Sequence, residues 1–447
     1  VGSTSSSSTS WSAHPSARPT LKMLPRMTAE RGGDARIARL FPWIFSNEAA
    51  NVKDLRALGE PALLVNVESS EGREIGSAVC NLQTGGPTSI NILARMMSYN
   101  AYLPIDRGFF TAHIRRALQH REHFLGSESD PFYRLVNAEG DSLPGVICDR
   151  YGDVLCLQFT AAASELLFED LLLDALEATL APRAIIVRAD AATDRLLEKA
   201  KERAPAVARG TYSGSTLFPA EDGFVFEANL LEKDWTSGRF FMERLQRSFL
   251  TRVFASSREQ GMSANGQKTP AARFPRVLSL FGESLGLKCA TLGAHLTFVE
   301  GLGQARREYA EALATRNGCA DRLQYMHLKT PQLDALGKDC LAAFDIVTLE
   351  PPPLAPTYGR LEEGMRQYTA WVALAAAAVR PQGLLLFSCR SRTMSAVKLM
   401  RCVNLGIWSA RRQAKLVHRS ASAPADFPVH MALPNMSEMQ VVALRLQ

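Results

Sequence analysis

The chain has 447 residues, of which 46% are hydrophobic and 21% are charged, and its formal net charge is +6. A chain of this length exceeds what one hydrophobic core holds, so we expect two or three domains. No apolar run approaches the roughly 20 residues of a membrane-spanning helix, which argues against membrane insertion. The eight cysteines include no CxxC pair. This pattern is typical of a reducing compartment and argues against a disulfide framework or a metal site.

The first 29 residues contain no acidic side chain, are rich in serine and include Arg18, Lys22 and Arg26. Basic, hydroxylated and acid-poor segments are typical of organellar transit peptides. We therefore predict a transit-like tail over residues 1–34 and localisation in the mitochondrial matrix. A disordered tail without a targeting role is the alternative, because such a composition cannot bury enough apolar surface to fold.

Residues 35–105 alternate short apolar segments with turns, a pattern that predicts a small β-barrel. Residues 106–222 predict an α/β connector that opens with a basic amphipathic helix. Its Arg115, Arg116 and Arg121 are candidates for phosphate contacts, although a solvated helix face is the more common meaning of such a charge run.

Residues 223–447 predict a second α/β domain, with the polar segment 256–275 as an inserted surface loop. In it, RVLSLFGESLGL predicts a strand that ends in small residues, where Ser284 and Gly286 would let the backbone approach a cofactor. Glu300 ends the next predicted strand, where an acid commonly binds ribose hydroxyls.

The most informative stretch is FDIVTLEPPP, followed by an alanine-rich segment and then GLLLFSCRSR. It predicts a strand over 344–349 that ends at Glu350, a helix over 361–378, and a strand over 384–388 that leads to Cys389. Ligands of an open α/β sheet bind at the carboxyl ends of its strands. We therefore expect Glu350 and Cys389 to face one crevice.

Several segments carry a family resemblance: RLFPWIFSNEA, PFYRLVNAEGDSLPGVICDRYGD, AEDGFVFEANLLEKDWTSGRFF and Ser388-Cys389-Arg390. Together they resemble the PUA-domain-containing class I methyltransferases that act on cytosine C5 of 23S ribosomal RNA, the ribosomal large subunit methyltransferase I type. The resemblance covers residues 35–447. It implies an α/β protein with a PUA-like RNA-binding barrel, a connector and a Rossmann-like methyltransferase domain.

The resemblance also implies roles for individual residues. Cys389 would be the nucleophile that adds to C6 of cytosine, with Glu350 near N3, and Arg390 would lower the pKa of the thiol. S-adenosylmethionine would be the cofactor. It would bind at positions corresponding to Ser284, Gly286, Glu300 and Leu328.

The chain departs from the family pattern at several of these positions. Leu285 replaces a glycine, Leu328 and Lys329 stand where an aspartate contacts adenine, Glu350 replaces an aspartate, and Asp-His-Pro becomes Asp426-Phe427-Pro428. A branched side chain at a point of close backbone approach should narrow the cofactor pocket. We therefore expect S-adenosylmethionine to bind weakly or not at all.

These departures favour a catalytically degenerate protein, a component or assembly factor of a mitochondrial ribosome. Its partners would be ribosomal RNA and ribosomal proteins, with phosphate contacts from the connector helix and from Arg390 and Arg392. An active methyltransferase that uses Cys389 is the alternative, and a protein-binding relative that does not bind RNA is a third possibility. The run ARRQAKLVHRS adds a further candidate surface at Arg411, Arg412, Lys415 and Arg419.

Overall fold

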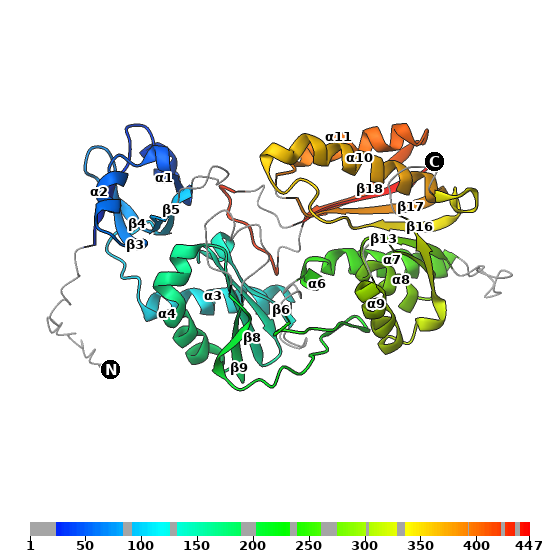
Figure 1. The fold of residues 1–447 in the computed structure, drawn as a ribbon, viewed down its shortest axis with the longest axis horizontal. Helices are drawn as coiled ribbons and strands as arrows, with labels where there is room; N and C mark the ends of the chain where they lie inside the picture. Colours follow the sequence, from blue (N-terminus) through cyan, green and yellow to red (C-terminus); the bar gives the residue numbers. More distant parts are fainter. Residues whose placement is uncertain are drawn as a thin grey trace, which may run out of the picture.

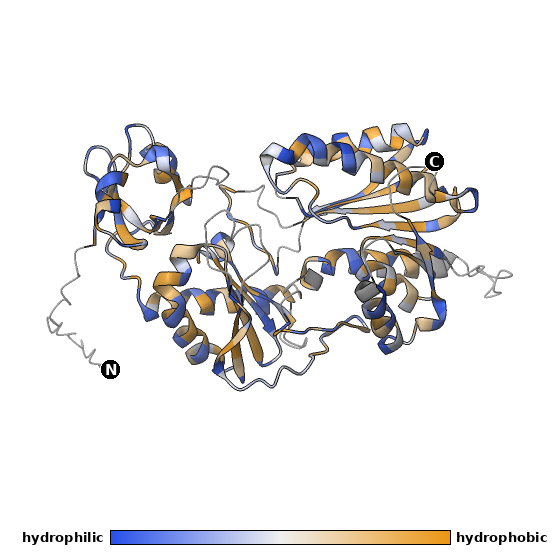
Figure 2. Ribbon diagram, in the orientation of Figure 1, coloured by the Kyte–Doolittle hydropathy of each residue, from blue (hydrophilic) through white to orange (hydrophobic). Residues whose placement is uncertain are grey.

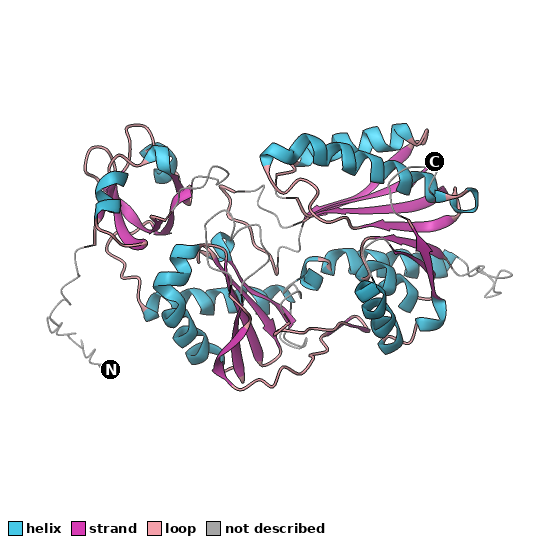
Figure 3. Cartoon of the chain, viewed as in Figure 1, coloured by secondary structure: helices cyan, strands magenta, loops and turns pink. Residues whose placement is uncertain are grey.

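The computed structural model contains, among its described residues, three large β-sheets that follow one another along the chain, each with helices packed on it (Figures 1 and 3). The described residues are 24–83, 92–125, 132–188, 203–232, 239–260, 275–300, 304–328, 336–391, 393–421, 425–433 and 439–447. The order of sheets and helices confirms the predicted α/β class.

The first sheet is curled and has the strand order β1-β3-β4-β5-β2, which is compatible with the predicted PUA-like barrel. Its elements are β1 Arg26–Thr28, α1 Asp34–Ala38, β2 Trp43–Phe45, η1 Ser46–Glu48, α2 Val52–Ala57, β3 Ala62–Glu68, β4 Glu74–Asn81 and β5 Ile92–Ser98. The predicted tail of residues 1–34 extends too far, because the first strand already begins at Arg26. β1 pairs in parallel with β3 because Met27 is apolar and fully buried, so the sheet begins at Arg26.

The second sheet has the order β10-β9-β8-β7-β6 and is antiparallel except for the pair of β8 and β9. Its elements are α3 Arg107–Leu125, β6 Phe132–Asn137, η2 Ala138–Asp141, β7 Val146–Tyr151, β8 Val154–Phe159, α4 Ala162–Leu180, β9 Ala184–Arg188 and β10 Ala206–Gly210. Helices α3 and α4 pack on one face. Apolar residues of the other face, Tyr151 and Ile186 among them, share a core cluster with the third sheet.

The third sheet has seven strands in the order β15-β14-β13-β16-β17-β19-β18. The first five are parallel, and β19 runs antiparallel to both of its neighbours. The strands are β13 Arg276–Leu280, β14 His295–Glu300, β15 Leu323–His327, β16 Phe344–Leu349, β17 Val379–Cys389, β18 Ala414–Ala421 and β19 Gln440–Leu446. A two-stranded hairpin, β11 Ala220–Glu221 and β12 Phe224–Val225, precedes this sheet.

Helices cover both faces of the third sheet, with α10 and α11 on one side and α7, α8 and α9 on the other (Figure 1). Hydrophobic residues gather between the layers (Figure 2). The helices are α6 Arg239–Met242, α7 Arg244–Gln260, α8 Ser284–Thr291, α9 Gln304–Arg316, α10 Leu361–Ala378 and α11 Ala396–Ser409, with the short 3-10 helices η3 Ala320–Arg322, η5 Lys338–Cys340 and η6 Tyr358–Arg360.

The strand predicted over 344–349 and the helix predicted over 361–378 are confirmed to the residue. The strand predicted over 384–388 is part of the longer β17, whose pairing with β16 shifts register before Leu384. The start predicted for the inserted loop at 256 was wrong, because α7 continues to Gln260. Residues 261–274 lie outside the described residues.

The short helix η2 contacts all three parts of the chain. Glu139 accepts a hydrogen bond from the Trp43 indole of the first sheet at 2.9 Å. Asp141 binds the buried guanidinium of Arg121 on α3. Gly140 lies against the backbone of Pro428 near the C-terminus, where an added β-carbon would stand 1.8 Å from the carbonyl oxygen.

We predict that Gly140→Ala destabilises the protein by a few kcal/mol, because the new methyl group meets backbone atoms that cannot move alone. Gly359→Ala is the matched control, since an added β-carbon there meets nothing within 4 Å. Chemical denaturation of the two variants measures the difference. Equal stabilities would contradict the packing of η2 on Pro428.

Candidate functional site

The candidate site lies at the carboxyl ends of β13, β16 and β17, where the strand order of the third sheet reverses. Glu350 directly follows β16, and its backbone N–H donates to the Leu280 carbonyl at 3.0 Å. Cys389 is the last residue of the adjacent strand β17. The structure thus brings these two residues to neighbouring strand ends.

The Glu350 side chain points to the α8 side of the sheet. Side chains alternate along a strand, so Glu350 shares a face with Thr348, whose hydroxyl lies 3.0 Å from that of Ser279. The Glu350 carboxylate covers Gly282, where an added β-carbon would stand 2.2 Å from its carboxyl carbon. With only 4% of its surface exposed, the carboxylate fills the space over the loop between β13 and α8.

The Cys389 side chain points to the opposite side, beneath α10 and α11. Cys389 lies on the same face of β17 as Leu385 and Phe387 and packs in the same hydrophobic core. Burial raises the pKa of the Cys389 thiol, and hydrogen bonds with Ser391 and Tyr368 only partly offset this. Because the thiolate is the nucleophilic form, a thiol that is 1% exposed and protonated at neutral pH is a poor nucleophile.

The expectation that Glu350 and Cys389 face one crevice was therefore wrong. The pairing of β16 with β17 places Leu349 beside Phe387. The next residues along the two strands are Glu350 and Ser388, so Glu350 lies beside Ser388 and not beside Cys389. One step along a strand moves a side chain to the other face of the sheet. The carboxylate and the thiol consequently lie on opposite faces.

The loops that follow β16 and β17 are held together by hydrogen bonds. The Tyr368 hydroxyl lies 2.6 Å from the Ser391 hydroxyl and accepts from the Leu354 backbone N–H at 3.0 Å. The Ala355 N–H donates to Ser391 at 3.2 Å. This arrangement, which sequence reasoning missed, gives Tyr368 and Ser391 a structural role. Arg390 is half-buried beside it, whereas Arg392 lies outside the described residues.

The predicted cofactor positions near the start of α8 differ from one another in their surroundings. Ser284 is buried, and its hydroxyl has no hydrogen-bond partner among the described residues. Gly286 packs against Ser279 of β13, so its missing side chain allows the helix to approach the strand. Leu285 is fully buried in the core cluster of α7, α8 and α9. The sequence led us to expect that Leu285 would crowd this loop. In the structure the side chain that lies over the loop is that of Glu350.

The two remaining cofactor positions lie at the ends of neighbouring strands. The backbone of Glu300 ends β14 and pairs with His327 of β15, and its side chain is outside the described residues. Leu328 follows β15 and is buried in the core cluster of α10 and α11. An apolar side chain there offers no acceptor for an adenine amine.

The three arginines of α3 that were predicted to contact phosphates divide between its two faces. Arg115 and Arg116 are exposed, as phosphate contacts require. Arg121 is fully buried, so its predicted contact with RNA was wrong. Helical spacing explains the difference, because Arg121 lies on the same face as the buried Ile114 and Ala117.

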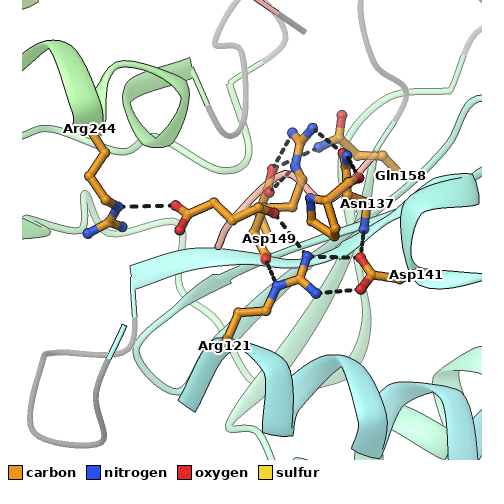
Figure 4. A network of polar contacts seen from close by, with 9 residues as sticks. Arg121, Asn137, Asp141, Asp149, Gln158 and Arg244 are labelled. Carbon is orange, nitrogen blue, oxygen red and sulfur yellow. Dashed lines mark hydrogen bonds and ion pairs between the residues drawn. The ribbon is translucent and has the colours of Figure 1, made fainter. Parts of the chain in front are cut away.

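Arg121 instead belongs to a polar network that joins the second sheet to the C-terminal part of the chain (Figure 4). Its guanidinium donates to Asp141 and, at 2.9 Å, to the backbone carbonyl of Asp426. Asn137 donates to the carbonyl of Pro428 at 3.0 Å. We call Arg121, Asn137, Arg244 and the segment 426–428 the clasp.

Arg244 completes the clasp from α7. Its guanidinium donates to the Asp426 carboxylate at 3.2 Å and to the Phe132 carbonyl at 2.8 Å. Burial raises the pKa of Asp426 to about 6, although Arg244 and Arg121 act in the opposite direction. Sequence reasoning noted the altered Asp-His-Pro motif, but nothing in the sequence indicated that Asp426 is buried against the connector.

Among the described residues, no helix is long and apolar enough to cross a membrane. Within the same residues, no group of three or more His, Cys, Asp or Glu side chains is placed to hold a metal ion.

Comparison with solved structures defines the class of fold. SMU.776 complexed with SAH superposes with a TM-score of 0.72 at 16% identity, covering 94% of this chain and all of that one. A structure from Streptococcus mutans that is described as a SAM-dependent methyltransferase gives 0.71 at the same identity and coverage. The fold is therefore that of a SAM-dependent methyltransferase with its preceding domains.

Sequence comparison identifies the particular relatives. The ribosomal RNA large subunit methyltransferase I of Vibrio cholerae is 28% identical over 418 residues, which are 92% of this chain and 97% of that protein. The protein of the same name from Shewanella amazonensis is 27% identical over 416 residues, 92% and 96% of the two chains. No protein-family model matches the chain. The predicted resemblance to these methyltransferases is confirmed.

The residues of the site match the requirements of S-adenosylmethionine in part. The Ser284 hydroxyl and the position of Glu300 at the end of β14 are compatible with cofactor contacts. However, the Glu350 carboxylate lies over the Gly282 backbone, and the apolar Leu328 stands at the end of β15, where the family resemblance implies an acceptor for the adenine amine.

We predict that Asp426→Asn gains stability relative to the unmodified protein as the pH rises from about 4 to about 7. A raised native pKa means that Asp426 stabilises the fold when protonated, and this stability is lost as the pH rises through about 6. Asparagine stays neutral, so the variant should gain up to about 3 kcal/mol over this range.

Chemical denaturation across the pH range measures this difference. Asp153→Asn is the control, because its hydrogen bond with Arg183 lowers the pKa of the exposed Asp153. Its effect should therefore have the opposite sign and should be confined to the acidic end of the range. A stability difference for Asp426→Asn that does not change with pH would contradict the assignment.

Proposed function

We propose that this chain is a methyltransferase-fold protein that binds ribosomal RNA of the large subunit and does not transfer methyl groups. In this proposal it acts as a ribosomal component or assembly factor, with ribosomal RNA and ribosomal proteins as partners. Its similarity along 92% of its length to enzymes named for large-subunit ribosomal RNA supports the substrate class.

The separation of Glu350 from Cys389 carries the proposal that catalysis is lost. Methylation at cytosine C5 needs a thiolate at C6 and an acid near N3 of the same base, so both groups must reach one pocket. Here the thiol lies beneath α10 with its pKa raised, while the carboxylate lies over Gly282 on the other face. One base cannot contact both without a rearrangement of the strand ends.

S-adenosylmethionine is the cofactor of the class to which the fold corresponds. We propose that this chain binds it weakly, since the Glu350 carboxylate occupies the space over Gly282 and Leu328 replaces a polar contact. A ligand that must displace a buried carboxylate loses much of its binding free energy to that displacement.

RNA contact does not depend on the lost pocket. Arg115 and Arg116 are exposed on α3, and Arg390 stands half-buried at the end of β17. Each phosphate contact adds affinity without reading the base sequence. The curled first sheet, compatible with a PUA-like barrel, offers a further surface for RNA.

The proposed site of action is the mitochondrial matrix. The first 29 residues contain three basic side chains and no acidic one, a composition typical of import sequences. A mitochondrial ribosome would then be the particle to which the protein binds.

An active cytosine-5 methyltransferase is the second candidate function. The hydrogen bonds with Tyr368 and Ser391 favour this alternative, because they lower the pKa of the Cys389 thiol against the effect of burial. An opening of the loops after β16 and β17 would have to expose the thiol before it could act.

We predict that the protein from isolated mitochondria sediments with large ribosomal subunits at low salt and is released by ribonuclease. Cys389→Ala should sediment in the same way, because the thiol has no contact with RNA in this account. Soluble protein at the top of the gradient, free of ribosomal RNA, would overturn the proposed function. Ribosome-bound protein that is absent from mitochondria would overturn only the localisation.

A further inference from the structure

The positive charge of the chain is concentrated in one segment. The chain has 51 Lys and Arg against 45 Asp and Glu. Between residues 364 and 425 there is no acidic residue, but there are ten basic ones: Arg366, Arg380, Arg390, Arg392, Lys398, Arg401, Arg411, Arg412, Lys415 and Arg419. The rest of the chain therefore has 41 basic residues against 45 acidic ones and is net negative.

The C-terminal part of this segment forms one border of the third sheet. Helix α11 packs beside α10, and the chain then turns into β18, the last strand in the sheet order (Figure 1). Between residues 408 and 419, Ser409, Gln413, Leu416 and Val417 are exposed, and the exposed aromatic and basic side chains are Trp408, Arg411, Lys415 and Arg419. We call these last four residues the basic edge.

Trp408 is unusual because its indole is 75% exposed near the C-terminus of α11. A tryptophan buries more apolar surface than almost any other side chain when it packs in a core, so such exposure suggests a binding role. An aromatic ring beside cations is the combination that binds single-stranded nucleic acid, with bases on the ring and phosphates on the cations.

Arg411 occupies a backbone position that favours glycine. It follows α11 with φ of 53°, and the N–H groups of Arg411 and Arg412 donate to the carbonyls of Trp408 and Ile407. This is the Schellman arrangement, in which glycine is the preferred residue. An arginine here gives up some backbone stability, and its backbone is hydrogen-bonded to that of Trp408.

The adjacent Arg412 has a different role. Its guanidinium donates to the carbonyls of Ala376 and Val379 and to that of Gln447. These contacts join α10, β17 and the C-terminus, so Arg412 is structural. The prediction from sequence that Arg412 belongs to the binding surface was wrong.

The strand β18 holds Lys415 and Arg419 in place on the two faces of the sheet border. Lys415 pairs with Arg445 of β19, on the face where His418 stacks on Phe249 of α7 at 4.7 Å. Arg419 pairs with Val442, whose side chain belongs to the core on the α11 side. The two cations therefore flank the strand, one on each side.

We propose that the basic edge binds single-stranded RNA, with phosphates on Arg411, Lys415 and Arg419 and one unpaired base stacked on Trp408. This proposal rests on the proposed function for the choice of RNA and adds a contact surface remote from Glu350 and Gly282. An acidic protein is the alternative occupant, and the competition experiment below distinguishes it from RNA.

The charge test compares two double variants in binding to a single-stranded RNA of about 20 nucleotides. Lys415→Gln with Arg419→Gln should weaken binding about tenfold and reduce the slope of log affinity against log salt by about 1.4. The control removes two exposed charges elsewhere, Arg316→Gln with Lys338→Gln. An unchanged slope for the first variant would overturn the proposal, whereas a wild-type protein without RNA affinity would overturn the proposed function itself.

Two single variants separate binding from folding. Arg411→Gly should weaken RNA binding while the melting temperature stays equal or rises, because glycine suits the left-handed conformation. Trp408→Ala should weaken single-stranded RNA binding about tenfold and leave binding of a duplex little changed, since paired bases cannot stack on the ring. Equal losses for both RNAs would contradict base stacking.

Competition identifies the class of occupant. Poly-glutamate of matched total charge should displace the RNA only at a large excess. If it competes as well as unlabelled RNA does, and Trp408→Ala leaves both affinities unchanged, the basic edge is a surface for acidic proteins and the proposal is wrong.

Discussion

The short helix η2 contacts all three parts of the chain and helps to fix their relative placement. Glu139 binds Trp43 of the first sheet, Asp141 binds Arg121 of α3, and Gly140 abuts Pro428. Arg121 and Asp141 form a buried ion pair, and loss of one partner of such a pair costs about 3–5 kcal/mol. Retention of Asp and Pro in the altered Asp-His-Pro motif follows from these contacts and needs no catalytic role.

The residues of the candidate site have packing and hydrogen-bonding roles of their own. Cys389 packs in the core beneath α10, and Tyr368 with Ser391 ties two strand-end loops together. The carboxylate of Glu350 covers Gly282. Each of these residues therefore contributes to packing or hydrogen bonding whether or not the protein transfers methyl groups.

The sequence predicted the strand at 344–349 and the helix at 361–378 because each has a clear apolar period and a proline or glycine boundary. It could not predict the faces of Glu350 and Cys389, which depend on the register between β16 and β17. Arg121 could have been assigned correctly, because its spacing from Ile114 and Ala117 marks the buried face of α3. The clasp joins residues about 300 positions apart and leaves no local pattern.

Titration of S-adenosylmethionine into the purified full chain, followed by calorimetry, tests the central claim most directly. The account predicts no saturable binding at low-micromolar cofactor, because the Glu350 carboxylate fills the space over Gly282 and Leu328 offers no acceptor. Low-micromolar binding by the unmodified protein would contradict it and restore the active methyltransferase as the better account.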